Sequence, residues 1–357
     1  MRTAGREAGR KEPRILLALA LLLPGCAAGA QDLAADGREW RGPIPIRNGR
    51  PYNQLTLQFT PESADVPGAG KSSFGAQLDI FNNLLVPSPR GTVVQEDFEE
   101  QRLTLSWRKG IGHGAEIAIV APIRYRDGGF LDPLMSVWHR LLGLRDRNRD
   151  NPLGRDAIGD FHSLLRLTDR FGNNVVNEGN AFGPGDVSAT FKRSLLRQNS
   201  RSGLAARFGI KLPTGNPGLV LGSGTFGAGL SLDGRYNLGP WWVVHANVER
   251  VWSGGATRVP SARSWVNGYV LAAEYRPNSR DSYVLQADGS SLVVETGNRR
   301  ADQSQTTFTI GYERTLDRRT ILYGSFSENG DWNNHHIAFL GNVGPDYTLT
   351  TGVKWRR

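Results

Sequence analysis

The chain has 357 residues, of which 39% are hydrophobic and 44 are glycine, and it carries a formal net charge of +9. Its one sustained apolar run, residues 15–24, is too short to span a bilayer as a helix, so the sequence excludes a helical membrane protein. No stretch rich in Lys and Arg with interleaved aromatic residues occurs, which excludes nucleic acid as an expected partner.

The first 30 residues have the composition of a secretory signal peptide. Five Arg and Lys residues precede the apolar run, and residues 28–30 form a small-x-small cleavage site. The single cysteine, Cys26, lies within this segment, so the exported chain would take no stability from disulfides. A second interpretation stays open, because residues 23–26 loosely resemble a lipoprotein box in which Cys26 would be lipidated.

Residues 226–251 show the pattern on which the fold prediction depends. In both 226–236 and 241–251, apolar residues alternate with polar residues or glycine, so each arm has one apolar and one polar face. The arms are about ten residues long, as a tilted strand needs to be to cross a membrane, whereas strands of soluble proteins average about five or six. The pattern indicates one hairpin of a transmembrane β-barrel, joined by turn residues 237–240.

The same alternation recurs along the chain. It predicts an all-β protein, a single antiparallel transmembrane β-barrel of about twelve strands. The apolar side of each strand is expected to contact lipid and the polar side to face an enclosed lumen. The predicted strands are 73–82, 98–108, 115–125, 185–194, 203–212, 225–236, 241–251, 265–275, 282–289, 305–314, 320–328 and 346–355. Two of them, 265–275 and 320–328, carry apolar residues on both faces.

The connections between these strands alternate strictly between short and long. Outer-membrane barrels have short periplasmic turns and longer external loops, so this alternation places both termini in the periplasm. The short connections are 109–114, 197–202, 237–240, 277–281 and 317–319, and the long ones are 84–97, 126–184, 213–224, 252–264, 290–304 and 329–345.

The predicted organisation is a signal peptide at 1–30, a periplasmic N-terminal segment at 31–60 and the barrel at 61–357. Prolines at 43 and 45 have no backbone N–H, so the N-terminal segment cannot form a regular β-ladder of hydrogen bonds. We therefore expect it to be extended and to end in a short strand.

Charged residues with the inward parity are the candidate lining of a solute path. On the lipid face such cations would cost about 2–4 kcal/mol each near the bilayer midplane, so the lumen is where they belong. Their near-neutral mixture predicts a cross-linked lumen with a narrow watery path, or else a network that only holds the barrel together. They are Arg102, Arg108, Glu116, Arg124, Asp186, Lys192, Arg207, Lys211, Asp233, Arg235, Glu249, Glu274, Asp288, Glu313 and Lys354.

The insert at 126–184 contains a predicted amphipathic helix in a loop assigned to the outside. Asp132 and Pro133 provide a helix start, and Gly143 can end it. The helix would act as a lid over the barrel mouth, lie on the outer leaflet, or pack against neighbouring loops. Its apolar face consists of Leu134, Val137, Trp138, Leu141 and Leu142.

The sequence predicts no catalytic residues, no metal and no cofactor. Residues 222–227 fit G-x-G-x-x-G, but they lead into an alternating strand and not into a helix, as a dinucleotide site requires. The six histidines show no metal-ligand spacing. His245, with Ser231 and Asn247 on the same predicted face, is the only combination that suggests a membrane-embedded hydrolase.

Several strings resemble one family of predicted Gram-negative outer-membrane proteins of unknown function. They are residues 46–51 with 57–61, 128–132 with Trp138-His139 and 143–144, and 183–187. The resemblance covers about residues 43–357 and implies an outer-membrane barrel, but it brings no substrate or catalytic residue. The chain is also distantly similar to outer-membrane transporters of hydrophobic compounds. The expected partners are outer-membrane lipids, the barrel-assembly machinery and a small solute; Trp355 lies near the terminus, as the assembly signal requires, but displaced by two residues.

Taken together, these patterns predict a passive channel or transporter for a small solute through a charge-lined lumen. The first alternative is a structural or cell-surface interaction barrel whose lumen does not conduct. The second is a membrane-embedded lipid hydrolase.

Overall fold

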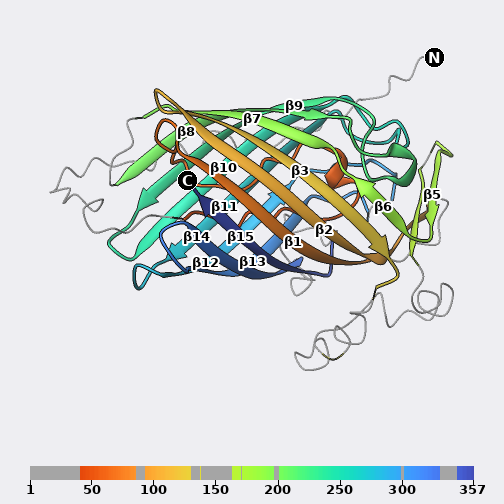
Figure 1. The fold of residues 1–357 in the computed structure, drawn as a ribbon. Helices are drawn as coiled ribbons and strands as arrows, with labels where there is room; N and C mark the ends of the chain where they lie inside the picture. Colours follow the sequence, from red (N-terminus) through yellow and green to blue (C-terminus); the bar gives the residue numbers. More distant parts are fainter. Residues whose placement is uncertain are drawn as a thin grey trace, which may run out of the picture.

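Twelve long strands close into one antiparallel barrel in the computed structural model (Figure 1). The structure describes residues 41–85, 93–129, 137, 163–169, 171–196, 201–298, 301–329 and 344–357. Closure is made by β1 and β15, which pair in register from Ser73 opposite Arg356 to Asn82 opposite Tyr347. The predicted signal peptide lies outside the described residues and stays a prediction.

All twelve strands lie where the alternating pattern predicted them, and each pairs with its neighbours along the chain. The barrel strands are β1 (Ser72–Leu85), β2 (Val93–Gly112), β3 (Ala115–Asp127), β7 (Val187–Ser194), β8 (Ser202–Leu212), β9 (Gly227–Asn237), β10 (Trp242–Ser253), β11 (Trp265–Tyr275), β12 (Asp281–Ser290), β13 (Gln305–Thr315), β14 (Thr320–Asn329) and β15 (Tyr347–Arg356).

The two ends of the barrel differ in their connections. We call the end with the short turns and the C-terminus the turn end, and the opposite end the loop end. At the turn end the Asp317 carboxylate accepts hydrogen bonds from the backbone N–H groups of Arg319 and Thr320 at 2.7 and 2.9 Å. These bonds favour the ionised carboxylate and hold the pKa of Asp317 below its usual value.

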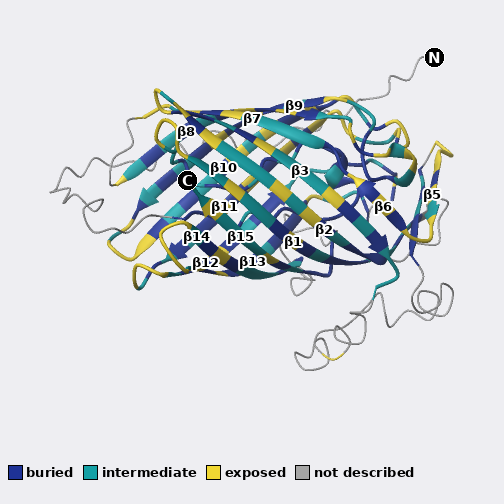
Figure 2. Ribbon diagram, in the orientation of Figure 1, coloured by how far each residue is buried: buried dark blue, intermediate teal, exposed yellow. Residues whose placement is uncertain are grey.

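The outer surface of the barrel is apolar. Burial alternates residue by residue along the strands (Figure 2), and the exposed residues include Phe208 and Leu230, at 48% and 63%. In two stacked sheets these side chains would be buried between the layers. Here they point outward, so the surface suits contact with hydrocarbon. No helix among the described residues is long and apolar enough to cross a bilayer.

Replacing Leu232 with Arg is expected to destabilise the barrel by about 2–4 kcal/mol, because it places a cation on the lipid face at the middle of β9. The matched control is Leu238→Arg, in the short turn after β9, where the added charge remains in water. Urea unfolding of both variants in liposomes measures the difference. Equal losses of unfolding free energy in the two variants would mean that the exposed row does not face lipid.

The insert at 126–184 adds short strands above the loop end. β4 (Leu164–Thr168) pairs with the extended end of β2 and with β5 (Asn174–Glu178), and β6 (Ala181–Pro184) continues the wall beside β3. The sequence predicts a long loop here, with one helix and no strands. Of that helix only Val137 is described, in a helical conformation; the rest lies outside the described residues.

Candidate functional site

Residues 41–65, which we call the lumenal segment, run inside the barrel (Figure 1). The segment starts at the turn end, where the Arg41 guanidinium donates to the Arg280 carbonyl at 2.6 Å. It turns at the loop end, in a 3₁₀ helix at Asn53–Leu55. It then returns to the turn end, where Arg235 Nε lies 3.0 Å from Asp65 Oδ1.

This path corrects the sequence prediction for residues 31–60. The prediction places them in the periplasm as an extended segment that ends in a short strand. The described part, 41–60, lies within the barrel and contains no strand. The physical reason is that a twelve-stranded barrel encloses more space than its own inward side chains fill, and this segment occupies the difference.

The ascending arm, residues 41–50, combines apolar packing with charge pairing. Ile44 and Ile46 pack against Phe81, Ala272 and Val284 of the wall. The arm's polar groups contact inward-facing carboxylates of the wall, as buried charges require. These contacts are the backbone N–H groups of Arg41 and Gly42 with Glu274, the side chain of Arg47 with Glu249, and that of Arg50 with Glu96.

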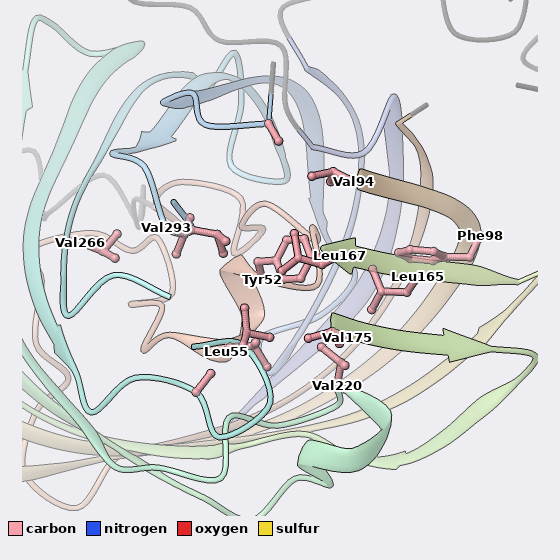
Figure 3. Close-up of a cluster of buried hydrophobic side chains, with 14 residues drawn as sticks. Tyr52, Leu55, Val94, Phe98, Leu165, Leu167, Val175, Val220, Val266 and Val293 are labelled. Atoms are coloured by element: carbon pink, nitrogen blue, oxygen red, sulfur yellow. The ribbon is translucent and has the colours of Figure 1, made fainter. Parts of the chain in front are cut away.

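The tip of the segment is anchored in an apolar cluster at the loop end. Tyr52 and Leu55 sit among side chains of β2, β4, β5 and the long loops (Figure 3). Asn53 and Gln305 exchange amide hydrogen bonds of 2.6 and 2.8 Å beneath this cluster. The loop end is therefore closed over the tip by both apolar and polar contacts.

The descending arm, residues 56–65, carries the most heavily paired carboxylate of the lumen. Glu62 bonds to Arg108 and lies 3.1 Å from Lys192 and 3.0 Å from Arg207. Its main chain is also fixed, since Asn247 Nδ2 donates to the Glu62 carbonyl at 3.0 Å. All four partners come from different strands, so Glu62 ties the arm to a wide part of the wall.

Inward-facing glycines make room for the segment. A Cβ at Gly311 would overlap the Ile44 side chain, and one at Gly209 would lie 2.7 Å from the Phe59 ring. A Cβ at Gly229 would lie 3.0 Å from the opposite edge of the same ring. The wall is therefore hollowed where the apolar side chains of the segment lie, which indicates that the two fit each other.

The fifteen predicted lumen residues all lie on the inner face. Most are buried, and most contact one another, the lumenal segment or other buried carboxylates of the wall. Four pairs join wall residues directly: Arg108 with Glu116 at 3.6 Å, Arg207 with Asp233 at 3.1 Å, Lys211 with Asp186 at 2.6 Å, and Lys354 with Glu313 at 3.0 Å. One oxygen of Asp288 and one of Glu313 have no hydrogen-bond partner among the described residues.

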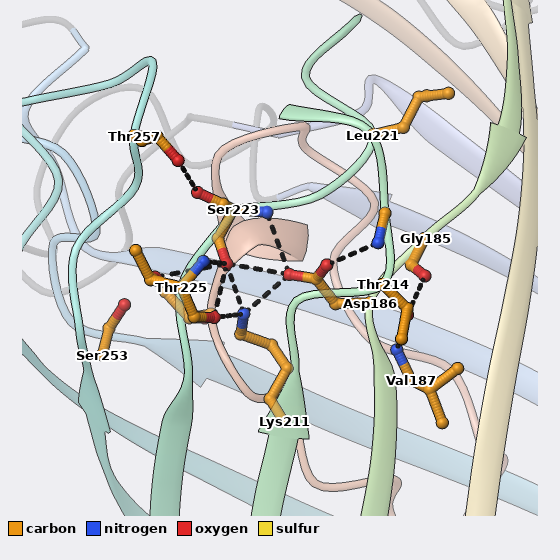
Figure 4. Close-up of polar contacts among 12 residues, drawn as sticks. Gly185, Asp186, Val187, Lys211, Thr214, Leu221, Ser223, Thr225, Ser253 and Thr257 are labelled. Atoms are coloured by element: carbon orange, nitrogen blue, oxygen red, sulfur yellow. Dashed lines mark hydrogen bonds and ion pairs between the residues drawn. The ribbon is translucent and has the colours of Figure 1, made fainter. Parts of the chain in front are cut away.

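The pair of Lys211 and Asp186 belongs to a compact polar cluster below the loop end (Figure 4). Lys211 also donates to the Ser223 hydroxyl and to the Thr225 carbonyl. The Ser223 N–H donates to Asp186 at 2.9 Å, so the glycine-rich string 222–227 folds around this ion pair. The string therefore has a structural role here.

Sequence reasoning missed several buried charges of the wall. Glu96 lies in the part of β2 that extends beyond the predicted strand, whereas Glu100 lies within that strand. Asp79 is the partner of Arg102, at 3.0 Å. Arg124 and Arg126 both bond to Glu100, at 2.8 and 3.1 Å. The sequence did contain a signal for them, because Asp79, Glu96 and Glu100 occupy the alternate strand positions whose side chains point into the lumen.

The hydrolase combination does not assemble. His245 stands opposite Arg235, whereas Ser231 stands opposite Glu249, four residues further along β10. His245 Nε2 lies 3.2 Å from Glu274 and is buried away from the lipid face. Among the described residues no three His, Cys, Asp or Glu side chains gather in a metal-binding arrangement.

One cavity of about 80 Å³ remains between the lumenal segment and the wall. It lies against β1, β2, β3, β7 and β8, and its lining contains four cationic side chains and one carboxylate. Hydroxyl and amide groups supply most of the rest, including Thr104 and Ser188. The charged members are Arg47, Arg102, Arg124, Lys211 and Asp186.

Comparison with known proteins agrees with this architecture. The model of a family described as "Protein of unknown function (DUF3187)" matches residues 24–330, which confirms the resemblance seen in the sequence. No curated protein matches the chain. The COG4313 outer membrane channel from Pseudomonas putida F1 is similar in structure, with a TM-score of 0.56 and 13% identity over 84% of this chain and 100% of that one.

Two further solved structures are more distant. The KdgM porin has a TM-score of 0.40 and 9% identity, over 79% of this chain and 98% of that one. The toluene transporter TodX of Pseudomonas putida has a TM-score of 0.35 and 11% identity, over 82% and 90%. At these similarities only the first structure bears on the fold, and none of them assigns a solute.

Proposed function

We propose that this chain, which belongs to the DUF3187 family, is an outer-membrane channel that passes a small polar solute. Its apolar exterior and closed ladder are those of a membrane barrel. The likeness to the COG4313 outer membrane channel of Pseudomonas putida F1 supports the outer membrane as its location.

The observation that carries this proposal is the polar cavity beside the lumenal segment. A barrel that served only as a scaffold would be expected to close its core, whereas here a charged and hydroxylated space adjoins five strands of the wall. The lining offers donors and acceptors to a polar solute in place of its hydration shell. We infer that the solute passes through this cavity, between the lumenal segment and β1–β3, β7 and β8.

Passage along this path requires the lumenal segment to shift, since about 80 Å³ is a local space and not a continuous pore. The segment is held by apolar contacts and by ion pairs and hydrogen bonds, and water can replace the polar ones. It carries the charges Arg47 and Glu62, whose wall partners would be hydrated in an open lumen. The lumenal segment therefore acts as a plug that opens in part or in full.

The test narrows the proposed path and leaves the rest of the lumen unchanged. Thr104→Trp and Ser188→Trp each fill the cavity from the wall, so the swelling of liposomes in small polar solutes should slow several-fold. Leu105→Trp is the matched control, because Leu105 is next to Thr104 on β2 but faces outward. Unchanged swelling rates in both cavity variants would place the path elsewhere.

A non-conducting structural barrel is the second candidate. The observation that favours it is the dense pairing of the lumenal segment with the wall, in particular at Glu62. Under that candidate, swelling would stay at the level of empty liposomes in the native protein and in both cavity variants alike.

A further inference from the structure

A single cation stands out on the lipid-facing surface near the loop end. Arg250 has the outward parity of β10, in the row of Val248 and Trp252. Among the twelve barrel strands as described, it is the one outward-facing Arg or Lys in the half nearer the long loops. A cation in this row destabilises the barrel in the membrane unless its charged group reaches the membrane interface. We therefore expect Arg250 to bind a partner at that interface.

The geometry shows that Arg250 points toward the interface. Its guanidinium carbon lies 4.8 Å from the centre of the Trp265 ring. In the β10–β11 register Trp265 stands opposite Trp252, two residues closer to the loop end than Arg250 itself. The side chain therefore leans along the wall toward the water side, as long cationic side chains do near a membrane surface.

The neighbours of Arg250 leave its charge available. Its register partner on β11 is Asn267, which is exposed and also faces outward. The described residues place no carboxylate or other hydrogen-bond acceptor against the guanidinium. Arg263 and Glu295, in loops at the same end of the barrel, form an exposed ion pair at 2.7 Å in which the two charges neutralise each other. The Arg250 guanidinium therefore lies on the Trp265 indole and beside the Asn267 amide, with an apolar wall next to it. This arrangement is complementary to a lipid that has an anionic headgroup and acyl chains.

We propose that Arg250, Asn267, Trp252 and Trp265 form a binding site for a phosphate-bearing lipid of the outer leaflet. The guanidinium and the Asn267 amide donate to phosphate oxygens, and the indoles lie at the headgroup level. The acyl chains lie along the apolar row that includes Leu230 and Val248. The site rests on the outer-membrane placement proposed above, but its chemistry can be measured on the purified barrel.

Native mass spectrometry of the detergent-purified protein tests the site. The probe is an acylated disaccharide with two phosphates, mixed with an equal amount of the same molecule without phosphates. The native protein should retain the phosphorylated form on the order of tenfold more strongly, and Arg250→Gln should reduce that preference to near one. Trp265→Leu, which removes the ring beneath the guanidinium, should weaken it in part.

The matched control is Arg314→Gln. Arg314 is also an outward-facing cation on the barrel, but it lies at the turn end with Asp281 3.6 Å away, so its loss should leave the preference intact. Heat-modifiable migration in gels confirms that each variant is folded. Equal retention of both lipids by the native protein, or an equal loss in Arg250→Gln and Arg314→Gln, would overturn the site. Neither outcome depends on whether the lumen conducts, so failure here is distinguishable from failure of the channel proposal.

Discussion

Deleting residues 42–65 is expected to turn a barrel of low conductance into a steadily open pore, with a rise of roughly tenfold or more in single-molecule conductance. The deletion removes the side chains that fill the lumen, and the wall charges left behind, such as Glu249 and Arg207, become hydrated. Planar-bilayer recording of the native and shortened proteins measures the change.

A milder variant serves as the control for assembly. Replacing Ile44, Leu57 and Phe59 with Ser keeps the chain length but removes the apolar contacts of the segment with Phe81, Ala272 and Val251. It should raise the frequency of openings without producing a permanently open pore. If the deletion variant folds and its conductance equals that of the native protein, the lumenal segment does not close the path.

Glu62→Gln is expected to release the descending arm at a cost of about 3–5 kcal/mol, because three buried or half-buried cations lose a carboxylate partner and Arg108 and Arg207 keep only one each, Glu116 and Asp233. Amide hydrogen exchange of peptides that cover 56–65 should then accelerate by about two to three orders of magnitude. The rest of the barrel should exchange at its native rate.

The control is an ion pair that is exposed. Glu178 lies 2.9 Å from Arg166 above the loop end, and both side chains are largely in water. Glu178→Gln should change stability by less than about 1 kcal/mol. Exchange of 56–65 that is equally slow in the native and Glu62→Gln proteins would show that the three cations do not hold the arm.

The barrel wall could be predicted from the sequence because strand periodicity is a local property. Each strand carries its own two faces, and the alternation of loop lengths orders them without knowledge of any distant contact. Even the ambiguous strand β11 followed this rule: Tyr269 and Leu271 face outward, while Val270 and Ala272 face inward. The apolar inward residues were the sign that something apolar fills the lumen.

The lumenal segment could not be predicted in the same way. Its prolines and its lack of a repeating pattern resemble those of an extended linker, and no local rule shows that a linker lies inside a barrel. The features that bear on it are distributed over the chain. Ile44 and Phe59 lie in the segment, whereas Gly209, Gly229 and Gly311, which accommodate them, lie on three different strands.

The charged residues show the same division. The inward parity of Glu249 and Glu274 followed from their strands, but their partners Arg47 and the Arg41 backbone belong to the lumenal segment. A parity argument can place a charge in the lumen, and only the three-dimensional fold can say what neutralises it. For this reason the near-neutral sum of the wall charges was a poor guide to how open the lumen is.

Disulfide formation between Ala64→Cys and Gly203→Cys tests the central claim most directly. A Cβ at Gly203 lies 3.4 Å from the Ala64 Cβ, close to the spacing of a disulfide. The exported chain is expected to have no other cysteine. The structure predicts a cross-linked 64–203 peptide in nearly all oxidised molecules, and none when Cys is placed instead at Gly234, which faces outward on β9. Absence of the 64–203 cross-link in folded protein would contradict a lumenal segment inside the barrel.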